Sequence, residues 1–276
     1  MRERLVSIHA PARGATHTTT GDIGKGTHAA LAACKRWVRR RPYVLKLDIR
    51  HFYATMDQEI LLGLLERRFP DPALMECLRR LVGSFASGPE EFLACRGDDL
   101  FSVLRPRGIR IGNLTSQFFA NFYLDALDHF IQEKLGWRGY MRYMDDLLLF
   151  GQTKRSLHEA REIVSKWLED ERRLHPHSRK TRVFPVRDGV PFVGFRVFPR
   201  HVRLDPGTGR RFVRRLRALG HAYARGEIEL DRIGRSVAGW VGHARHGTTG
   251  RLVGKVLREA VVPPRRHGMA GAGSTA

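Results

Sequence analysis

The chain has 276 residues, of which 49 are Lys or Arg and 28 are Asp or Glu, so its formal net charge at pH 7 is +21. A hydrophobic content of 42% excludes a disordered chain, and the length is sufficient for one large domain or for two to three small lobes. The positive charge disfavours a protein that handles small neutral substrates. It indicates a nucleic-acid partner, because Lys and Arg that neutralise phosphates release counterions.

The cysteines and the apolar runs indicate the cellular compartment in which the protein is expected. Cys34, Cys77 and Cys95 are scattered and form no CxxC pair, so they predict neither a disulfide framework nor a zinc ribbon. The first residues lack an apolar signal core, and no apolar run reaches membrane-spanning length. We therefore expect a soluble protein of the reducing cytoplasm.

The first part of the chain predicts helices around one short strand. Ala29, Ala33 and Trp37 recur every four residues, as on one face of a helix. Asp57 is a good N-cap for the helix that follows it. The expected elements are a weakly ordered lead over residues 1–20, helices over 26–40, 58–65 and 72–85, a strand over 44–49, and a loop or small hairpin over 86–110.

A long amphipathic helix opens the second part. It starts near Ser116, repeats apolar residues at three- and four-residue steps, and ends at Gly136. The further expected elements are two strands over 140–150 around a tight turn at residues 145–146, a helix over 157–168, a strand or hairpin over 192–199, basic helices from 211 onward, and a disordered tail from 263.

Three acids stand next to apolar strands. Asp48 follows one strand, and Asp145 and Asp146 lie between two others. The adjacent pair is compatible with an ordinary turn. In a buried hairpin, however, two adjacent carboxylates repel each other unless a cation lies between them. Hard cations such as Mg²⁺ bind carboxylates of this kind, and a third acid would let two ions clamp a phosphoryl transfer.

Four segments resemble the palm motifs of reverse transcriptases, in the family's order. Residues 47–53 with Asp57 resemble the first motif, and residues 107–117 with 120–124 the second. Residues 143–146 are similar to the Tyr-x-Asp-Asp box, and residues 192–196 to the primer-grip hairpin. The resemblance runs from about Gly24 to about Leu257.

The resemblance implies an α+β fold: a right-hand polymerase palm of antiparallel sheet and packed helices, with partial fingers and a helical thumb. The implied boundaries are partial fingers and first part of the palm over 21–110, palm with both hairpins over 111–204, basic thumb over 205–262, and disordered tail over 263–276. The fingers are expected to be truncated, because the stretch before Asp48 is short.

The resemblance also implies the site residues. Asp48, Asp145, Asp146 and the Ile49 carbonyl are the implied metal ligands, and Lys180 the implied acid that protonates the departing pyrophosphate. Nucleotide-binding roles fall to Tyr53, Ile111, Gly112, Ser116 and Gln117, with the ring of Tyr53 blocking a ribose 2′-OH. Nucleic-acid-binding roles fall to Arg107, Asn121, Gly194, Arg196, Arg214, Arg217, Trp240 and His243.

Several of these roles have ordinary alternatives. Either Phe52 or Tyr53 must be a core aromatic, and Ile111 is as well explained by packing on the long helix. Ser116, Gln117 and Asn121 suit capping or solvation, and Lys180 suits a phosphate contact or a plain surface position.

The implied activity is RNA-directed DNA polymerisation with two Mg²⁺ ions, or Mn²⁺. The implied partners are an RNA template, an RNA/DNA hybrid, deoxynucleoside triphosphates and a small basic accessory protein. The segment that ends in Ser116 and Gln117 is similar to enzymes of diversity-generating retroelements, whose errors concentrate at template adenines. Group II intron, retron and antiphage enzymes stay open, as does a catalytically inactive RNA-binding relative.

Overall fold

The computed structural model describes residues 26–112 and 114–259. They belong to two compact units, the first ending at Asp188 and the second beginning at Gly189. The lead expected over residues 1–20 and the tail expected from 263 lie outside the described residues. Within the described ranges, no helix has both the length and the apolar character that a bilayer crossing requires.

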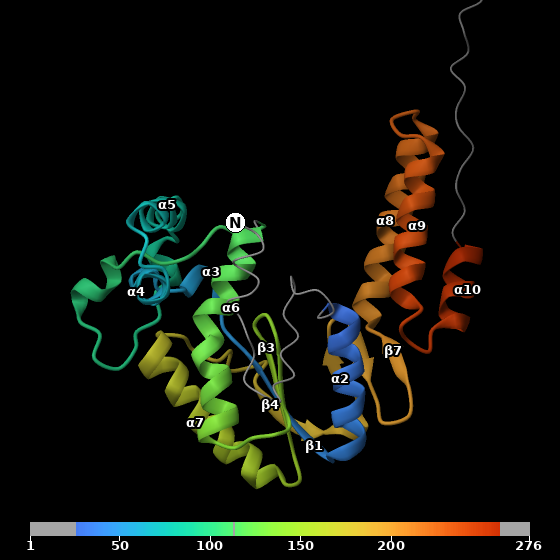
Figure 1. The fold of residues 1–276 in the computed structure, drawn as a ribbon. Helices are drawn as coiled ribbons and strands as arrows, with labels where there is room; N and C mark the ends of the chain where they lie inside the picture. Colours follow the sequence, from blue (N-terminus) through green and yellow to red (C-terminus); the bar gives the residue numbers. More distant parts are fainter. Residues whose placement is uncertain (1–25, 113, 260–276) are drawn as a thin grey trace, which may run out of the picture. The chain divides into compact units, whose positions relative to one another are not determined.

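The first unit contains most of the predicted elements (Figure 1). Its helices are α2 (Thr27–Arg40), α3 (Phe52–Thr55), α4 (Gln58–Arg68), α5 (Pro72–Gly83), α6 (Leu114–His129) and α7 (Lys154–Arg172), with short 3₁₀ turns η1 (Pro89–Glu91), η2 (Leu100–Leu104) and η4 (Val186–Asp188) and a π-turn η3 (Phe130–Lys134). Its strands are β1 (Tyr43–Asp48), β2 (Tyr140–Tyr143), β3 (Asp146–Gly151) and β4 (Arg182–Pro185).

The predicted N-cap at Asp57 is confirmed, and α5 starts with a cap of the same kind. Asp57 accepts a hydrogen bond from the Ile60 amide at 3.0 Å and so caps α4. Asp71 accepts from Ala73 at 2.9 Å at the start of α5, where Pro72 occupies the first turn. Such caps satisfy amides that have no intrahelical partner and contribute about 1 kcal/mol each.

A four-stranded antiparallel sheet, ordered β2-β3-β1-β4, forms the centre of the first unit. Because strand side chains alternate between faces, Leu45 and Leu47 join the core formed with α6 and α7. The opposite face carries Val44 and Phe150, and Trp37 of α2 stacks on Phe150 with ring centroids 6.4 Å apart. The sheet is therefore covered on both faces (Figure 1).

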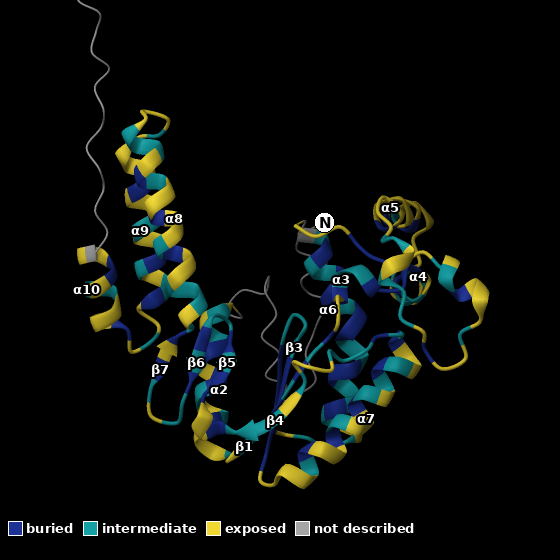
Figure 2. Ribbon diagram, turned by 180° about the vertical axis from the view of Figure 1, so that it is seen from behind, coloured by how far each residue is buried: buried dark blue, intermediate teal, exposed yellow. Residues whose placement is uncertain are grey.

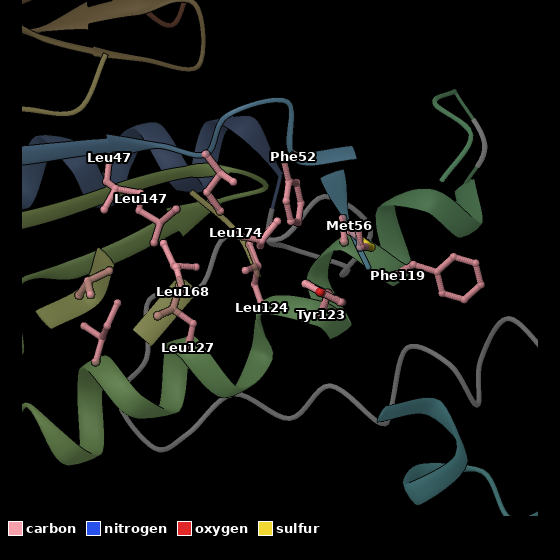
Figure 3. Close-up of a cluster of buried hydrophobic side chains, with 14 of the residues drawn as sticks. Leu47, Phe52, Met56, Phe119, Tyr123, Leu124, Leu127, Leu147, Leu168 and Leu174 are labelled. Atoms are coloured by element: carbon pink, nitrogen blue, oxygen red, sulfur yellow. The ribbon is translucent and has the colours of Figure 1, made fainter. Parts of the chain in front are cut away.

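Leucines make up much of the core on the α6 and α7 side (Figure 3). Leu47 of β1 and Leu147 of β3 face Leu127 of α6 and Leu168 of α7, and all four side chains are 0% exposed. Full burial of a leucine contributes about 1.5–3 kcal/mol. This core fixes the ends of β1 and β3, which carry the predicted carboxylates. β3 is buried after Asp146, its half-buried first residue (Figure 2).

The region over residues 86–110 contains the 3₁₀ turns η1 and η2 and no strand among its described residues, so of the two predicted forms the loop is confirmed. Leu100, Phe101 and Leu104 on η2 are 83%, 74% and 78% exposed. The hairpin turn of β2 and β3 also differs from the prediction. It comprises Met144 and Asp145, and Asp146 already belongs to β3.

The second unit combines a small sheet with helices. Its elements are β5 (Val190–Phe192), β6 (Phe195–Val197), β7 (Val202–Leu204), α8 (Pro206–Ala224), α9 (Leu230–Ala244) and α10 (Gly250–Glu259). The sheet is antiparallel in the order β5-β6-β7. Val193 and Gly194 join β5 to β6 with positive φ at both residues, as in type I′ turns. Phe212 and Trp240 stack at 4.2 Å and join α8 to α9.

Candidate active site

The three predicted acids converge at one end of the sheet. Asp48 is the last residue of β1 and Asp146 the first of β3, and the two are direct partners in the antiparallel register. Asp145 precedes Asp146 in the turn. Strand pairing thus brings Asp48 to the same end of the sheet as Asp145, which lies 97 positions later in the sequence (145 − 48).

The turn that carries Asp145 has a strained backbone. Met144 has a φ of +57° and is the first residue of a two-residue turn, a position at which type II′ turns favour glycine. A non-glycine residue in this region costs on the order of 1–3 kcal/mol and persists only where surrounding contacts hold it. Strain of this kind is common at functional sites.

Charge repulsion acts on the carboxylates. The pKa of Asp145 is raised, first by burial and then by the neighbouring charges of Asp146 and Asp48. Two lysines supply positive charge: Lys46 Nζ lies 2.7 Å from Asp146 Oδ1, and Lys180 Nζ lies 3.1 Å from Asp48 Oδ2. The cluster therefore favours cations next to it.

The donor set suits a divalent metal only in part. In the described ranges, no group of three or more His, Cys, Asp or Glu side chains is arranged to hold an ion as it stands. The chemistry nevertheless fits a hard cation, because carboxylate oxygens are its preferred ligands and the half-buried, ionised Asp145 is destabilised by its acidic neighbours. The Ile49 carbonyl follows Asp48 directly along the chain.

Backbone hydrogen bonds bring Lys180, which is distant from Asp48 in sequence, next to the acids. The Arg50 amide donates to the His175 carbonyl at 2.9 Å, and the His177 amide donates to the Asp48 carbonyl at 2.7 Å. These bonds hold the segment before β4 against the end of β1, and they place the Lys180 ammonium beside Asp48. The Lys180 side chain is 60% exposed, so solvent reaches it beside Asp48.

Phe52 and Tyr53 differ in burial. Phe52 is 3% exposed and belongs to the core, whereas Tyr53 is half-buried. Burial, followed by the charge of Asp145, raises the pKa of Tyr53 to about 12. The phenol thus lies within the electrostatic reach of the carboxylates and stays protonated at neutral pH.

The loop before α6 is tied to this region. The Gly108 amide donates to the Met56 carbonyl at 2.8 Å, and the Ile109 amide donates to the Tyr53 carbonyl at 2.9 Å. Ile111 is 74% exposed, so it does not pack on the long helix. Gly112 has a φ of +103° with open space around it, and that φ is the reason for a glycine.

Three residues that the resemblance assigns to ligand binding have internal partners instead. Ser116 is 5% exposed and its hydroxyl donates to the Arg110 carbonyl, which closes the loop before α6. Arg107 is 9% exposed; it donates to the Ser102 carbonyl and lies over the Phe92 ring. Asn121 is 8% exposed and accepts from Arg142 at 3.1 Å. Gln117 is half-buried on α6.

The remaining predicted contacts lie in the second unit. Trp240 is 8% exposed, so its stacking on Phe212 explains it as a packing residue. Gly194 lies in the β5–β6 turn, where an added Cβ would meet His243 Nε2 at 3.4 Å, and the His243 ring contacts Phe195 at 4.7 Å. Arg196 is half-buried on β6, and Arg214 and Arg217 are exposed on α8.

Sequence reasoning missed Lys46, Asp128 and Arg142. Lys46 precedes Asp48 by two residues in a strand, so period-two alternation alone places both side chains on one face. Arg142 stands in a short strand, directly after the buried Tyr140 and Met141. A charged residue in such a strand indicates a buried ion pair, but only the packing identifies Asp128 as its partner.

Replacing Lys46 with Met should lower the melting temperature of the metal-free protein by about 2–4 °C. The change removes an ammonium from Asp146, a partly exposed pair worth about 1 kcal/mol. Addition of Mn²⁺ should then raise the melting temperature more than in the wild type, because the metal no longer competes with the ammonium.

Differential scanning fluorimetry with and without MnCl₂ measures both effects. Lys166→Met, on the exposed face of α7, is the matched control and should leave both quantities unchanged. An equal Mn²⁺ response in Lys46→Met and wild type would show that Lys46 does not compete for the carboxylates.

The sheet order, the helices on both faces and the paired carboxylates define a polymerase palm. The family described as "Reverse transcriptase (RNA-dependent DNA polymerase)" matches residues 8–197. The chain belongs to this family of RNA-directed DNA polymerases. Among curated proteins, none matches the chain in sequence.

Solved telomerase structures share the fold. One from Candida albicans, in complex with a telomeric RNA fragment, matches with a TM-score of 0.53 at 14% identity, over 94% of this chain and 47% of that one. Apo telomerase from Candida tropicalis gives a TM-score of 0.55 at 11% identity, over 92% and 49%. The chain thus spans about half the length of these structures, and identities this low concern the fold alone.

Proposed function

We propose that the chain is an RNA-directed DNA polymerase of a diversity-generating retroelement that uses a two-metal nucleotidyl transfer. The observation that carries the polymerase proposal is the register pairing of Asp48 with Asp146, next to the half-buried Asp145. In this arrangement, three carboxylates of a reverse transcriptase family member lie at one end of the sheet. The cytoplasm is the expected compartment.

The proposed metal ligands and the proposed proton donor are all residues of the first unit. Asp48, Asp145, Asp146 and the Ile49 carbonyl would hold two Mg²⁺ or Mn²⁺ ions, which when bound stabilise charge on the attacking and leaving oxygens. Lys180 gives a proton to the departing pyrophosphate or contacts its phosphate. Its ammonium is already within 3.1 Å of Asp48.

The sugar and base of the incoming deoxynucleotide are proposed to contact other residues. The half-buried ring of Tyr53 excludes a 2′-OH by steric clash. Ile111, Gly112 and Gln117 line the nucleotide at the start of α6, and Ser116 acts by closing that loop.

The second unit is proposed to hold the RNA template and the RNA/DNA hybrid. Helix α8 contains no acidic residue and exposes five arginines, Arg210, Arg211, Arg214, Arg215 and Arg217. Arginines of this kind contact phosphates and position a duplex without reading its sequence. Arg196, Gly194 and His243 are the proposed contacts of the β5–β6 hairpin, and a small basic accessory protein is a proposed partner.

Primer extension tests the polymerase proposal. The purified chain, supplied with a primer annealed to RNA, deoxynucleotides and Mg²⁺ or Mn²⁺, should extend the primer. Binding of the annealed RNA without any extension, with either metal, would favour a catalytically inactive RNA-binding relative instead.

Replacing Ile111 with Gln should lower misincorporation by about three- to tenfold. Ile111 is exposed beside Gly112 and offers no hydrogen-bonding group to a nucleotide, whereas one added hydrogen bond is worth about 0.5–1.5 kcal/mol net. Sequencing of products copied from a defined RNA measures the effect, with Ile111→Leu as the apolar control.

The same sequences test the retroelement type. Errors concentrated at template adenines support a diversity-generating enzyme. Errors spread evenly over the four template bases would favour a retron or group II intron enzyme. An error spectrum in Ile111→Gln equal to that of wild type would show that Ile111 has no part in nucleotide selection.

A further inference from the structure

A buried ion pair lies behind the carboxylate hairpin. Arg142 on β2 is 1% exposed and Asp128 on α6 is 0% exposed. The guanidinium donates from Nε to Asp128 Oδ1 at 2.8 Å and from Nη2 to Oδ2. A two-point contact of this kind fixes the plane of the guanidinium as well as its position.

The same guanidinium also contacts the turn of Met144 and Asp145. Its Nη1 donates to the Met144 carbonyl at 3.1 Å and to Asn121 Oδ1 at 3.1 Å. Met144 is the residue with positive φ that precedes Asp145. Because Asn121 and Asp128 both belong to α6, Arg142 connects that helix directly to the backbone of the turn.

The register places Arg142 on the face away from the acids. Arg142 pairs with Leu147, whereas Asp146 pairs with Tyr143 and with Asp48. Side chains alternate along each strand, so Arg142 points toward α6 and Asp146 points to the opposite face. The guanidinium therefore supports the turn from behind and does not line the carboxylate site.

Stability alone does not account for this pair. Replacing a buried ion pair by apolar residues of similar volume is often neutral or stabilising, since desolvation offsets the attraction. The Met144 turn, in contrast, needs contacts that keep its strained backbone in place. The Arg142 guanidinium joins this turn to Asp128 and Asn121.

We propose that Arg142 is a positioning residue, which holds the turn of Met144 and Asp145 at a fixed place relative to α6 and thereby sets the geometry of the carboxylates. The inference rests on the proposed polymerase function and extends it. Residues that orient metal ligands from behind typically change metal affinity or activity about 10- to 100-fold when altered.

Arg142→Lys tests the proposal, because Lys keeps the charge but cannot bridge Asp128 and the Met144 carbonyl together. Arg172→Lys is the matched control. Arg172 is also buried, at 6% exposure, and its guanidinium donates to the Tyr123 and Glu171 carbonyls at 2.7 Å. None of its described contacts involves the turn.

Two readouts distinguish positioning from general destabilisation. Mn²⁺ affinity, measured by electron paramagnetic resonance on the chain with MnCl₂ alone, should fall about 10- to 100-fold in Arg142→Lys and less than about twofold in Arg172→Lys. The kcat for single-nucleotide addition should follow the same pattern, while the Kd for primer–template stays within about twofold of wild type. Wild-type Mn²⁺ affinity and kcat in Arg142→Lys, or equal losses in both variants, would overturn the proposal.

Asp128→Asn decides the question where Arg142→Lys does not fold, because Asn has nearly the same shape and removes the charge that orients the guanidinium. It should weaken Mn²⁺ binding in the same direction, and wild-type affinity in a folded Asp128→Asn protein would overturn the proposal. The Mn²⁺ measurement is independent of polymerisation. A wild-type chain that binds Mn²⁺ but extends no primer would contradict the proposed function and still leave the role of Arg142 measurable.

Discussion

An Asp145→Asn variant is expected to lose primer extension by about 10³-fold or more while its fold becomes more stable. The loss follows from removing a negative oxygen from the proposed metal site, where bound metal supplies several kcal/mol and each 1.4 kcal/mol is tenfold in rate. The gain in stability follows from the raised pKa of Asp145.

The sign of the stability effect follows from linkage. A carboxyl whose pKa is higher in the folded than in the unfolded chain costs free energy when it ionises in the fold. This cost is fully present above the folded pKa, decreases as the pH falls below the folded pKa, and is gone below the unfolded pKa. Asn cannot ionise, so the melting temperature at pH 7 without metal should rise. The difference from wild type should shrink as the pH falls below the folded pKa of Asp145 toward the unfolded value.

Thermal melts between pH 4 and pH 8, together with single-nucleotide extension rates, measure the two effects. Asp170→Asn, on the exposed face of α7, is the matched control and should change neither. Extension by Asp145→Asn at the wild-type rate would mean that the site is misassigned. A lowered melting temperature would contradict the repulsion among the three carboxylates.

The elements that position these carboxylates could be predicted because their signals are local. β1 and β3 are apolar runs next to acids, and Asp57 precedes its helix with the expected cap chemistry. The predicted turn at residues 145–146 lies one residue later than the observed turn at Met144 and Asp145. Sequence does not separate the two positions, because aspartate suits a turn equally at either of them. The register of β1 and β3 pairs Asp146 with Asp48. No local sequence pattern contains this pairing, because the two strands are distant in the chain.

The roles of individual polar residues could not be predicted as well. Arg107, Ser116 and Asn121 stand in motifs that suggest ligand contacts, yet each is buried with a partner inside the first unit. A polar residue is equally compatible with a surface contact and with a buried hydrogen bond. Which of them applies depends on packing between elements that are distant in sequence, as with Arg142 and Asp128.

The small sheet of the second unit shows the same limit. The hairpin over residues 192–199 has a recognisable motif, but β7 has only three residues, too few for an alternation to be read from sequence. Its pairing with β6 makes the hairpin part of the unit that contains α8, α9 and α10.

Replacing Tyr53 with Val is expected to relax the discrimination against ribonucleotides by about 10- to 200-fold, the range that steric differences of 1–3 kcal/mol supply. Phe52 is fully committed to the core, so Tyr53 is the aromatic of this pair that remains available to a bound sugar. Its ring packs on Phe52 with centroids 5.4 Å apart, and this contact fixes where the ring stands. Val leaves space where the ring would meet a 2′-OH.

The ratio of kcat/KM for a deoxynucleotide to that for the matching ribonucleotide measures this discrimination. Tyr53→Phe is the matched control: it removes the hydroxyl, whose pKa is raised by burial and by Asp145, but it keeps the ring. If the ring acts by steric exclusion, Tyr53→Phe retains the wild-type ratio and only Tyr53→Val relaxes it. Equal relaxation in both variants would assign selection to the hydroxyl, and an unchanged ratio in Tyr53→Val would place the sugar gate at another residue.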